Sequence, residues 1–233
     1  MIPARWGSTR LPGKPLLLVG DLPLVEHVRR RVQGAASVER VVVATDDARI
    51  AAAVEAGGGE ARLTGPHTSG THRVAALLDQ VEGEYVLNVQ CDQPGLNPAH
   101  VDAVVALLRE GAEVATLAAP LPEDADPADP SRVKVVLDTA GDALYFSRAP
   151  IPVGGPWLRH IGIYGFTRTA LARCVQAPPS ALERSEDLEQ LRWLAAGIRV
   201  RVGLVDRVAE SLDTSDQLHA LARPPEPDLP RIP

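Results

Sequence analysis

The residues best suited to chemistry lie near the start of the chain, in the segment 2–15, which reads Ile-Pro-Ala-Arg-Trp-Gly-Ser-Thr-Arg-Leu-Pro-Gly-Lys-Pro. Gly7 and Gly13 have no Cβ, so backbone N–H groups there can approach a ligand closely, and the prolines restrict the loop. The cationic side chains that could neutralise a polyanion are Arg5, Arg10 and Lys14. This combination suits a phosphate group, although composition alone would favour a basic surface loop. The spacing matches neither the G-x-x-x-x-G-K-S/T loop of ATPases nor the G-x-G-x-x-G turn of dinucleotide dehydrogenases.

A second group of polar residues follows the segment 85–90, whose alternating pattern predicts a strand. This strand is expected to stop at Cys91-Asp92-Gln93-Pro94. Because ligands bind at the carboxyl ends of strands in an open α/β sheet, Asp92 is the candidate functional residue there. Cys91 could be a nucleophile, but no His and Cys arrangement of recognised spacing surrounds it, so we expect a small buried residue.

The elements that must position these residues alternate along the chain between helical and strand patterns. Strands are predicted at 40–45, 61–64, 85–90, 114–118 and 200–205, with a β-hairpin at 133–146. Helices are predicted at 24–33, 48–56, 101–108 and 180–192, with further helices beginning at 66–73 and 169–174. This order predicts a single α/β domain over residues 1–223, Rossmann-like, with a mixed and mostly parallel sheet flanked by helices and a small hairpin subregion.

Local signals refine three of these segments. Asp46 is expected to cap the helix 48–56 rather than to contact a ligand. The helix 180–192 begins with a Ser N-cap signal and has a predicted core stripe of Leu182, Leu188, Leu191 and Leu194. The proline-rich acidic stretch 120–130 is a solvated loop, and the tail 224–233, which contains five prolines, should be poorly ordered.

The composition excludes several classes of function. A chain of 233 residues with 45% hydrophobic content can bury one substantial core. The net charge of −6 argues against a general nucleic-acid or anionic-membrane binder, whose affinity would depend on excess Lys and Arg. Without a long apolar run or a signal sequence, the chain is expected to be cytoplasmic and not membrane-bound. Two cysteines are too few for a disulfide framework. Only Met1 and Ile2 are left to form a strand before the basic loop, so we expect that the first strand is very short or that the natural chain begins upstream.

Several segments between residues 2 and 218 match motifs of one family in the family's order. Residues 67–73 are similar to H-x-S-G-T-E-R, and residues 88–94 to N-V-Q-G-D-E-P. Residues 133–152 contain V-K-V-V-L-D and A-L-Y-F-S-R-A-P-I-P, and residues 159–166 match R-H-x-G-I-Y-G-Y/F. Residues 179–192 match P-S-x-L-E-x-x-E-x-L-E-Q-L-R, and residues 211–218 resemble x-x-D-T-P-E-D-L. Together with the basic loop, these motifs resemble the CMP-Kdo synthetases, or 3-deoxy-manno-octulosonate cytidylyltransferases, of the sugar-nucleotide transferase fold.

This resemblance implies a reaction and a set of roles. An oxygen of a small acidic acceptor would attack the α-phosphorus of CTP, and pyrophosphate would leave. Arg10 and Lys14 would stabilise the pyrophosphate, while Asp92 and Asp213 would bind Mg²⁺. The residues implied in nucleotide binding are Pro3, Ala4, Arg5, Gly7, Ser8, Thr9, Ser69, Gly70, Arg73 and Gln90. Those implied in acceptor binding are His72, Gln93, Lys134, Arg159, His160, Tyr164, Glu189 and Gln190. The resemblance also suggests a homodimer.

Some of these residues have simpler interpretations. The Ser-Gly-Thr turn at 69–71 and Asp213 are also typical of helix caps, and Lys134 could be a lysine at a sheet edge. With the first loop present as well, we favour binding for the Ser-Gly-Thr turn.

The chain departs from the family at four places. His72 and Gln93 replace Glu, Cys91 replaces Gly, and the loop 153–157 is short. We expect these departures on the acceptor side, so the acceptor stays open between Kdo and a smaller acid such as phosphonoformate of phosphonate natural-product pathways. A nucleotide-binding regulator without turnover is a further alternative, which the retention of the cationic and acidic residues argues against.

Overall fold

The computed structural model describes residues 1–7 and 12–206. Ser8, Thr9, Arg10, Asp213 and the tail 224–233 lie outside the described residues, as does the end of the predicted domain. Among the described helices, none is long and apolar enough to cross a membrane.

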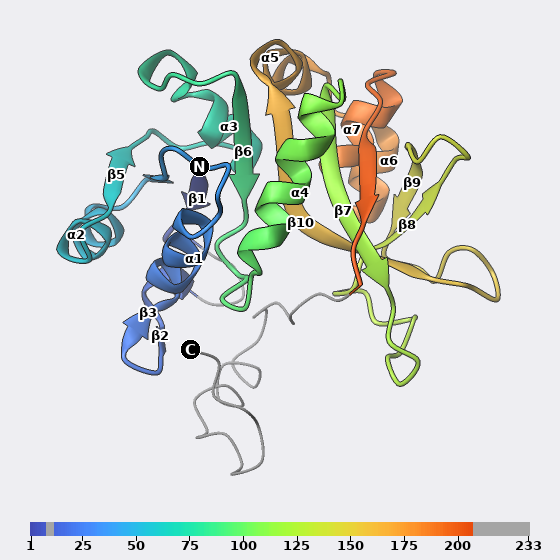
Figure 1. Ribbon diagram of the computed structural model, residues 1–233, viewed down its shortest axis with the longest axis horizontal. Helices are drawn as coiled ribbons and strands as arrows, with labels where there is room; N and C mark the ends of the chain where they lie inside the picture. Colours follow the sequence, from blue (N-terminus) through green and yellow to red (C-terminus); the bar gives the residue numbers. More distant parts are fainter. Residues whose placement is uncertain (8–11, 207–233) are drawn as a thin grey trace.

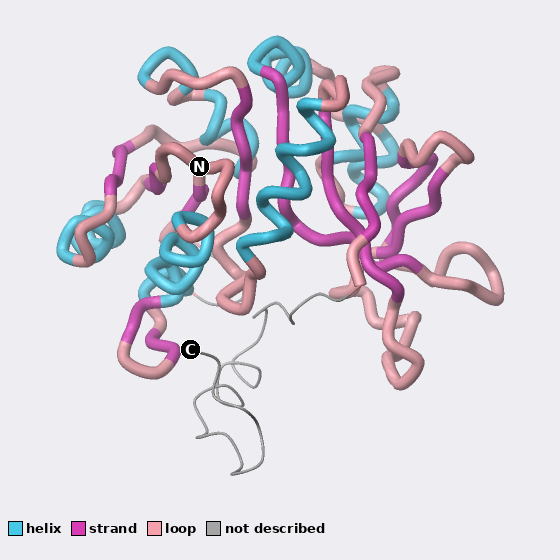
Figure 2. The backbone as a smooth tube through the Cα atoms, in the orientation of Figure 1, coloured by secondary structure: helices cyan, strands magenta, loops and turns pink. Residues whose placement is uncertain are grey.

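The centre of the fold is a mixed sheet (Figures 1 and 2). Its strands are β1 (Ile2–Ala4), β4 (Val42–Thr45), β5 (Glu60–Leu63), β6 (Tyr85–Val89), β7 (Val114–Pro120), β10 (Leu158–Thr167) and β11 (Arg201–Leu204). Met1 joins the strands β1, β4 and β5 to β6, since its N–H group donates to Leu87 O and its carbonyl accepts from Val89 N. The order is therefore β5-β4-β1-β6-β10-β7-β11, with β10 antiparallel to β6 and β7. The predicted mixed, mostly parallel sheet is confirmed.

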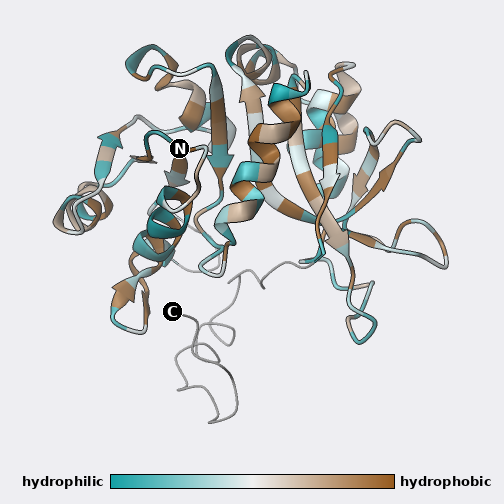
Figure 3. Cartoon of the chain, viewed as in Figure 1, coloured by the Kyte–Doolittle hydropathy of each residue, from teal (hydrophilic) through white to brown (hydrophobic). Residues whose placement is uncertain are grey.

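Helices cover both faces of this sheet. They are α1 (Leu24–Gln33), α2 (Ala48–Ala56), α3 (Gly70–Ala75), α4 (Pro98–Arg109), α5 (Arg168–Gln176), α6 (Ala181–Glu186) and α7 (Gln190–Ala195), with short 3-10 helices η1 (Lys14–Leu16) and η2 (Leu78–Gln80). One core lies under α1, α2 and α4, and a second lies under α3, α5 and α7. Figure 3 shows the apolar residues along the central strands and hydrophilic residues on the outer side of α1. Amphipathic helices on two faces of one sheet give the three-layer arrangement expected of an α/β domain.

The predicted hairpin is also present. Strands β8 (Lys134–Leu137) and β9 (Ala143–Ser147) pair antiparallel. Strand β8 also pairs antiparallel with the first residues of β10. Helix α7 packs against β9, so the hairpin and the last helices form one end of the molecule (Figure 1). A smaller hairpin, β2 (Leu18–Val19) with β3 (Leu22–Pro23), precedes α1.

Three local expectations need correction. Asp47, not Asp46, caps α2, because its side chain accepts from Arg49 N. The predicted helix 180–192 is divided into α6 and α7 by Asp187, whose φ of 52° is left-handed. This break turns Leu182 outward, to 42% exposure, while Leu188 and Leu191 remain buried. The predicted Ser180 cap is confirmed, in a capping box with Glu183.

Candidate active site

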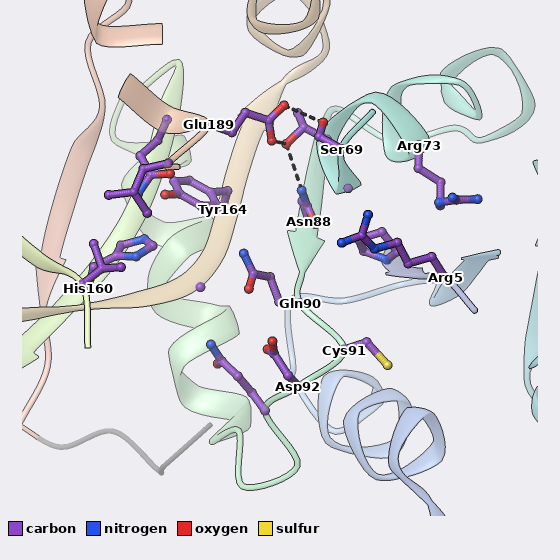
Figure 4. Close-up of a pocket in the computed structure, with 18 of the residues that line it drawn as sticks. Arg5, Ser69, Arg73, Asn88, Gln90, Cys91, Asp92, His160, Tyr164 and Glu189 are labelled. Carbon is purple, nitrogen blue, oxygen red and sulfur yellow. Dashed lines mark hydrogen bonds between the residues drawn. The ribbon is translucent and has the colours of Figure 1, made fainter. Parts of the chain in front are cut away.

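A cavity of about 480 Å³ opens where β1 and β6 end and α3 begins. This is the sheet edge at which open α/β folds bind ligands. It is lined by most of the predicted site residues, namely Pro3, Ala4, Arg5, Lys14, Ser69, Gly70, Arg73, Gln90, Asp92, Gln93, Arg159, His160, Tyr164, Glu189 and Gln190. Gly7, His72 and Lys134 are described but do not line it. Figure 4 shows how its walls come from segments far apart in the sequence.

Cationic groups gather on the side of the cavity next to β1. Arg5 directly follows this strand, and Lys14 begins η1. The Lys14 ammonium lies 3.3 Å from Asp92 Oδ2, so the basic loop and the end of β6 meet. Arg73 is buried and donates to Asp46 Oδ2 at 2.8 Å and to Thr64 Oγ1 at 2.5 Å. These positively charged side chains can neutralise an anionic ligand locally, although the chain as a whole is acidic.

The residues after β6 form the floor of the cavity. Cys91 and Asp92 are half-buried and both line it. Burial, with a further contribution from Asp92, raises the pKa of the Cys91 thiol to about 12, so this thiol is protonated and a poor nucleophile at neutral pH. The prediction that Cys91 is not a nucleophile agrees with this, although its side chain is not fully buried. A Cβ on Gly162 would lie 2.9 Å from Gln93 Nε2, so the glycine lets β10 approach this amide.

Glu189 is held in the opposite wall by the first turn of α3. Its Oε1 accepts from Ser69 Oγ at 2.6 Å, and its Oε2 accepts from Thr71 Oγ1 at 2.7 Å. Asn88 Nδ2 donates in turn to Thr71 Oγ1 at 3.2 Å. Both hydroxyl hydrogens therefore point at one carboxylate, which fixes its orientation (Figure 4).

His72 lies behind this wall and contacts its residues. Its Nδ1 is 2.8 Å from Ser69 Oγ and 3.4 Å from Glu189 Oε1. Because the Ser69 hydroxyl has one hydrogen and donates it to Glu189, the His72 Nδ1 must carry a hydrogen and act as the donor. The expectation that His72 touches the acceptor is thus revised, since the side chain supports Ser69 and Glu189 instead.

His160 is oriented by Thr116 of β7. The Thr116 hydroxyl lies 2.7 Å from the carbonyl oxygen of Ile163 and 3.1 Å from His160 Nε2. A carbonyl can only accept, so the hydroxyl donates to it and accepts from Nε2–H, which leaves Nδ1 as an acceptor. Burial, assisted by the charge of Arg159, lowers the pKa of His160 to about 3, so the ring is neutral at neutral pH.

An aromatic cluster continues the wall beyond His160. Tyr164 lies 5.2 Å from His160 and 5.0 Å from Trp193, measured between ring centroids. Tyr164 Oη, Trp193 Nε1 and Asn88 Oδ1 are buried without a hydrogen-bond partner among the described residues, and all three side chains line the cavity. Buried polar atoms without partners are unusual in folded proteins and are typical of sites that bind a ligand or water.

Arg148 lines the cavity, whereas Lys134, which was expected on the acceptor side, does not. Lys134 is completely buried, and its ammonium donates to the carbonyls of Asp129 and Arg148 at 3.0 and 2.6 Å, so it supports the wall from behind. It is therefore neither a lysine exposed at a sheet edge nor a cavity residue. Arg148 does line the cavity, and its Nε donates to the carbonyl of Glu186 at 2.8 Å. It was not selected from the sequence, although it belongs to the matched F-S-R motif.

Of the two carboxylates expected to bind the metal, Asp92 is the one that lies among the described residues. Within residues 1–7 and 12–206, no group of three His, Cys, Asp or Glu side chains could enclose a metal ion. The second expected carboxylate, Asp213, lies outside these residues. One carboxylate in a cavity of about 480 Å³ is compatible with Mg²⁺, which usually binds one or two carboxylates together with phosphates and water.

The chain is similar to known cytidylyltransferases over its length. Residues 1–200 match the family model described as Cytidylyltransferase. A 3-deoxy-manno-octulosonate cytidylyltransferase of Afipia carboxidovorans is 47% identical over 96% of this chain and 94% of its own. The enzyme of the same name from Xanthomonas campestris is 46% identical over 93% of this chain and 95% of its own.

Solved structures give the same result. A CMP:2-keto-3-deoxy-manno-octonic acid synthetase in complex with CTP is 42% identical, covers 95% of both chains and superimposes with a TM-score of 0.89. A cytidylyltransferase from Leptospira borgpetersenii, with a TM-score of 0.65 over 95% of this chain and 83% of its own, is 18% identical and shares the fold. The predicted α/β nucleotidyltransferase fold is confirmed.

Proposed function

Since this chain belongs to the 3-deoxy-manno-octulosonate cytidylyltransferase family, we propose that it transfers CMP from CTP to 3-deoxy-manno-octulosonate, a sugar acid, and releases pyrophosphate. The observation that carries the proposal is one cavity with two chemically different sides. Arg5 and Lys14 lie on a cationic side suited to a triphosphate. Glu189 and His160 lie on a side of fixed hydrogen-bonding groups suited to a polyol acid.

The described residues suit the reaction through binding and orientation. Lys14 and Arg5 would neutralise charge on the phosphates as pyrophosphate leaves, which lowers the barrier without covalent chemistry. The neutral His160 would accept a hydrogen bond from an acceptor hydroxyl through Nδ1, and the Glu189 carboxylate would accept another. Arg159 and Arg148 would face the acceptor carboxylate. Holding both substrates in one geometry supplies much of the catalysis in reactions of this kind.

We also propose Mg²⁺ as the cofactor, with Asp92 as a ligand and Asp213 as the second. When bound, Mg²⁺ would lower the pKa of the attacking oxygen and neutralise phosphate charge. Asp92 supports this assignment because its carboxylate lines the cavity, and carboxylate oxygens are the ligands that Mg²⁺ prefers.

Fewer of the departures from the family lie near the acceptor than the sequence suggested. Two of the four departures, His72 and the loop 153–157, do not line the cavity. Cys91 and Gln93 do line it, yet neither favours phosphonoformate by its chemistry. No observation favours a regulator without turnover either, and relatives at 46–47% identity are cytidylyltransferases.

A cytidylylation assay tests the proposal. Purified protein with CTP and Mg²⁺ is expected to release pyrophosphate with Kdo and to do so much more slowly with phosphonoformate. Asp92→Asn should lower turnover by about 10²-fold or more, because the loss of a carboxylate ligand weakens the binding of the Mg²⁺ that would neutralise the reacting phosphate. Asp21→Asn, at an exposed turn, is the matched control and should leave the rate unchanged. Turnover of phosphonoformate and not of Kdo would overturn the proposed acceptor, and CTP binding without turnover of either would overturn the activity.

The remaining expectations are proposals about context. We propose that the protein is a cytoplasmic homodimer. Light scattering after size-exclusion chromatography would test the dimer, and a mass near 24.8 kDa would contradict it. Cell fractionation of the source organism would test the compartment.

A further inference from the structure

Trp6 lies in the sequence between Arg5 and Lys14, the two described cationic residues of the basic loop, both of which line the cavity. It directly follows Arg5, and its carbonyl accepts from Gly13 N at 3.0 Å, one residue before Lys14. Its own N–H donates to Asp46 Oδ1 at 3.1 Å. The main chain of Trp6 therefore links Gly13 to the residue that follows the end of β4.

The indole side chain makes a second set of contacts. The guanidinium of Arg49 lies 3.3 Å from the centroid of the ring, in a cation–π contact. Gly13, with a φ of 72°, approaches so closely that a Cβ there would lie 2.8 Å from Cη2 of Trp6. The indole thus contacts Gly13, one residue before Lys14, and also Arg49 of α2.

The partners of Trp6 are themselves fixed. Arg49 donates to both carboxylate oxygens of Asp47 at 2.9 and 2.6 Å, and Asp47 caps α2. Asp46, which accepts from Trp6 N, also accepts from Arg73, a buried cation of the cavity wall. One residue therefore connects the loop, the first turn of α2 and the wall of the cavity.

We propose that Trp6 is the positioning residue of the nucleotide side. Although it does not line the cavity, it sets the separation of Arg5 and Lys14 and so the affinity for CTP, while leaving the acceptor side unchanged. This inference rests on the proposed function, because it assigns the cationic side to CTP.

The alternative is that Trp6 only contributes to packing, since it is half-buried against the core under α1 and α4. The two roles differ in what they change. A packing residue affects the melting temperature and leaves the KM values in place. A positioning residue raises the KM for CTP and leaves the KM for the acceptor and kcat nearly constant.

The test compares Trp6→Leu with Trp6→Phe in calorimetric CTP titrations and in steady-state kinetics. Leu keeps an apolar side chain without a ring, and we expect CTP to bind about three- to tenfold more weakly, whereas Phe, which retains a ring for Arg49, should recover most of the loss. Trp157→Leu is the control, because this indole donates to Pro152 O on a loop that does not line the cavity.

A second variant guards against misfolding of the first. Arg49 is exposed, with 59% of its side chain accessible, so Arg49→Gln should fold. The substitution removes the cation–π partner of Trp6 and the ion pair of Arg49 with Asp47. We expect weaker CTP binding with an unchanged acceptor KM. If the wild-type protein binds CTP, and both Trp6→Leu and Arg49→Gln bind it within twofold of the wild-type affinity, the inference is overturned. Failure of the wild-type protein to bind CTP would instead overturn the proposed function.

Discussion

At the scale of single residues, Glu189 is defined by hydrogen bonds that all point toward it. Two hydroxyls, from Ser69 and Thr71, donate to its two oxygens at 2.6 and 2.7 Å. Glu189→Gln replaces one oxygen with an NH₂ group, so a donor would face a donor in a partly buried site, which costs about 1–3 kcal/mol. We expect the KM for the acceptor to rise about tenfold or more, with the KM for CTP unchanged.

Steady-state kinetics with each substrate varied in turn would measure this split. Glu113→Gln is the matched control, because that carboxylate is 55% accessible and pairs with Arg173 at the surface. An equal rise in both KM values would mean that Glu189 stabilises the whole cavity rather than the acceptor side.

His160 gives a prediction about pH. Its pKa in the folded protein is about 3, lowered by burial, whereas an unfolded histidine titrates near 6.5. Below pH 6.5 the unfolded chain therefore binds a proton that the folded protein does not. The stability contributed by the neutral ring is fully present above pH 6.5 and is lost as the pH falls toward 3.

Thermal unfolding at pH 7.5 and pH 5 would measure this loss. The wild-type melting temperature should fall more between these values than that of His160→Asn, which has no group titrating in the window. If the two proteins lost the same amount, the ring would be protonated in the folded state and could not act as the acceptor inferred from its contact with Thr116.

At the scale of elements, the contact between α4 and β10 depends on the absence of a side chain at Gly165. A Cβ there would lie 2.5 Å from Val104 Cγ1 and 2.8 Å from Leu108 Cδ1, inside a buried core. Gly165→Ala should lower the free energy of unfolding by about 1–3 kcal/mol through overpacking. Denaturant unfolding would measure it, and the KM values should not change because Gly165 does not line the cavity.

The double variant Gly165→Ala/Val104→Ala is the internal control, since removal of Cγ1 makes space for the new methyl group. The double variant should lose less unfolding free energy than the sum of the losses in the two single variants, as expected for residues in contact. Simple additivity would show that the helix moves away instead of accepting strain at this point.

Much of this arrangement could be predicted from the sequence because the hydrophobic period is local. Alternation gave the strand β6, and helical spacing gave α1 and α4, each within a few residues of its observed ends. The left-handed Asp187 was not predicted, because a non-glycine residue with positive φ carries no pattern in neighbouring side chains. The exposed Leu182 follows from the same break.

The site was predictable only where a residue touches the ligand side directly. Asp92 was found because it closely follows the predicted strand 85–90, at the edge of the sheet where open α/β folds bind ligands. The contact of Glu189 with Ser69 joins residues 120 positions apart, and no local signal encodes it. Arg148 and Lys134 are close in space, but which of the two faces the cavity depends on how the hairpin packs, so Lys134 was selected from the sequence and Arg148 was missed.

At the scale of the whole molecule, the cavity lies between two hydrophobic cores that share one sheet. Ile163 of β10 belongs to the core under α1 and α4, while its neighbour Tyr164 belongs to the core under α3, α5 and α7. Residues from both parts line the cavity. A ligand there contacts both cores at once, and the shared strand should make them unfold together.

CTP should therefore shift a single unfolding transition. At about 100 times its Kd, a ligand that binds only the folded state stabilises it by about 2.7 kcal/mol, which for a domain of this size raises the melting temperature by about 5–10 °C. Calorimetry with CTP, with GTP as the control nucleotide and the Kd measured by titration, would test this value. Two transitions, of which CTP moves only one, would contradict it, because they would mean that the core under α1 and α4 and the core under α7 unfold independently. A single transition that moves by the expected amount would instead require that the shared strand β10 transmits the binding energy across the sheet.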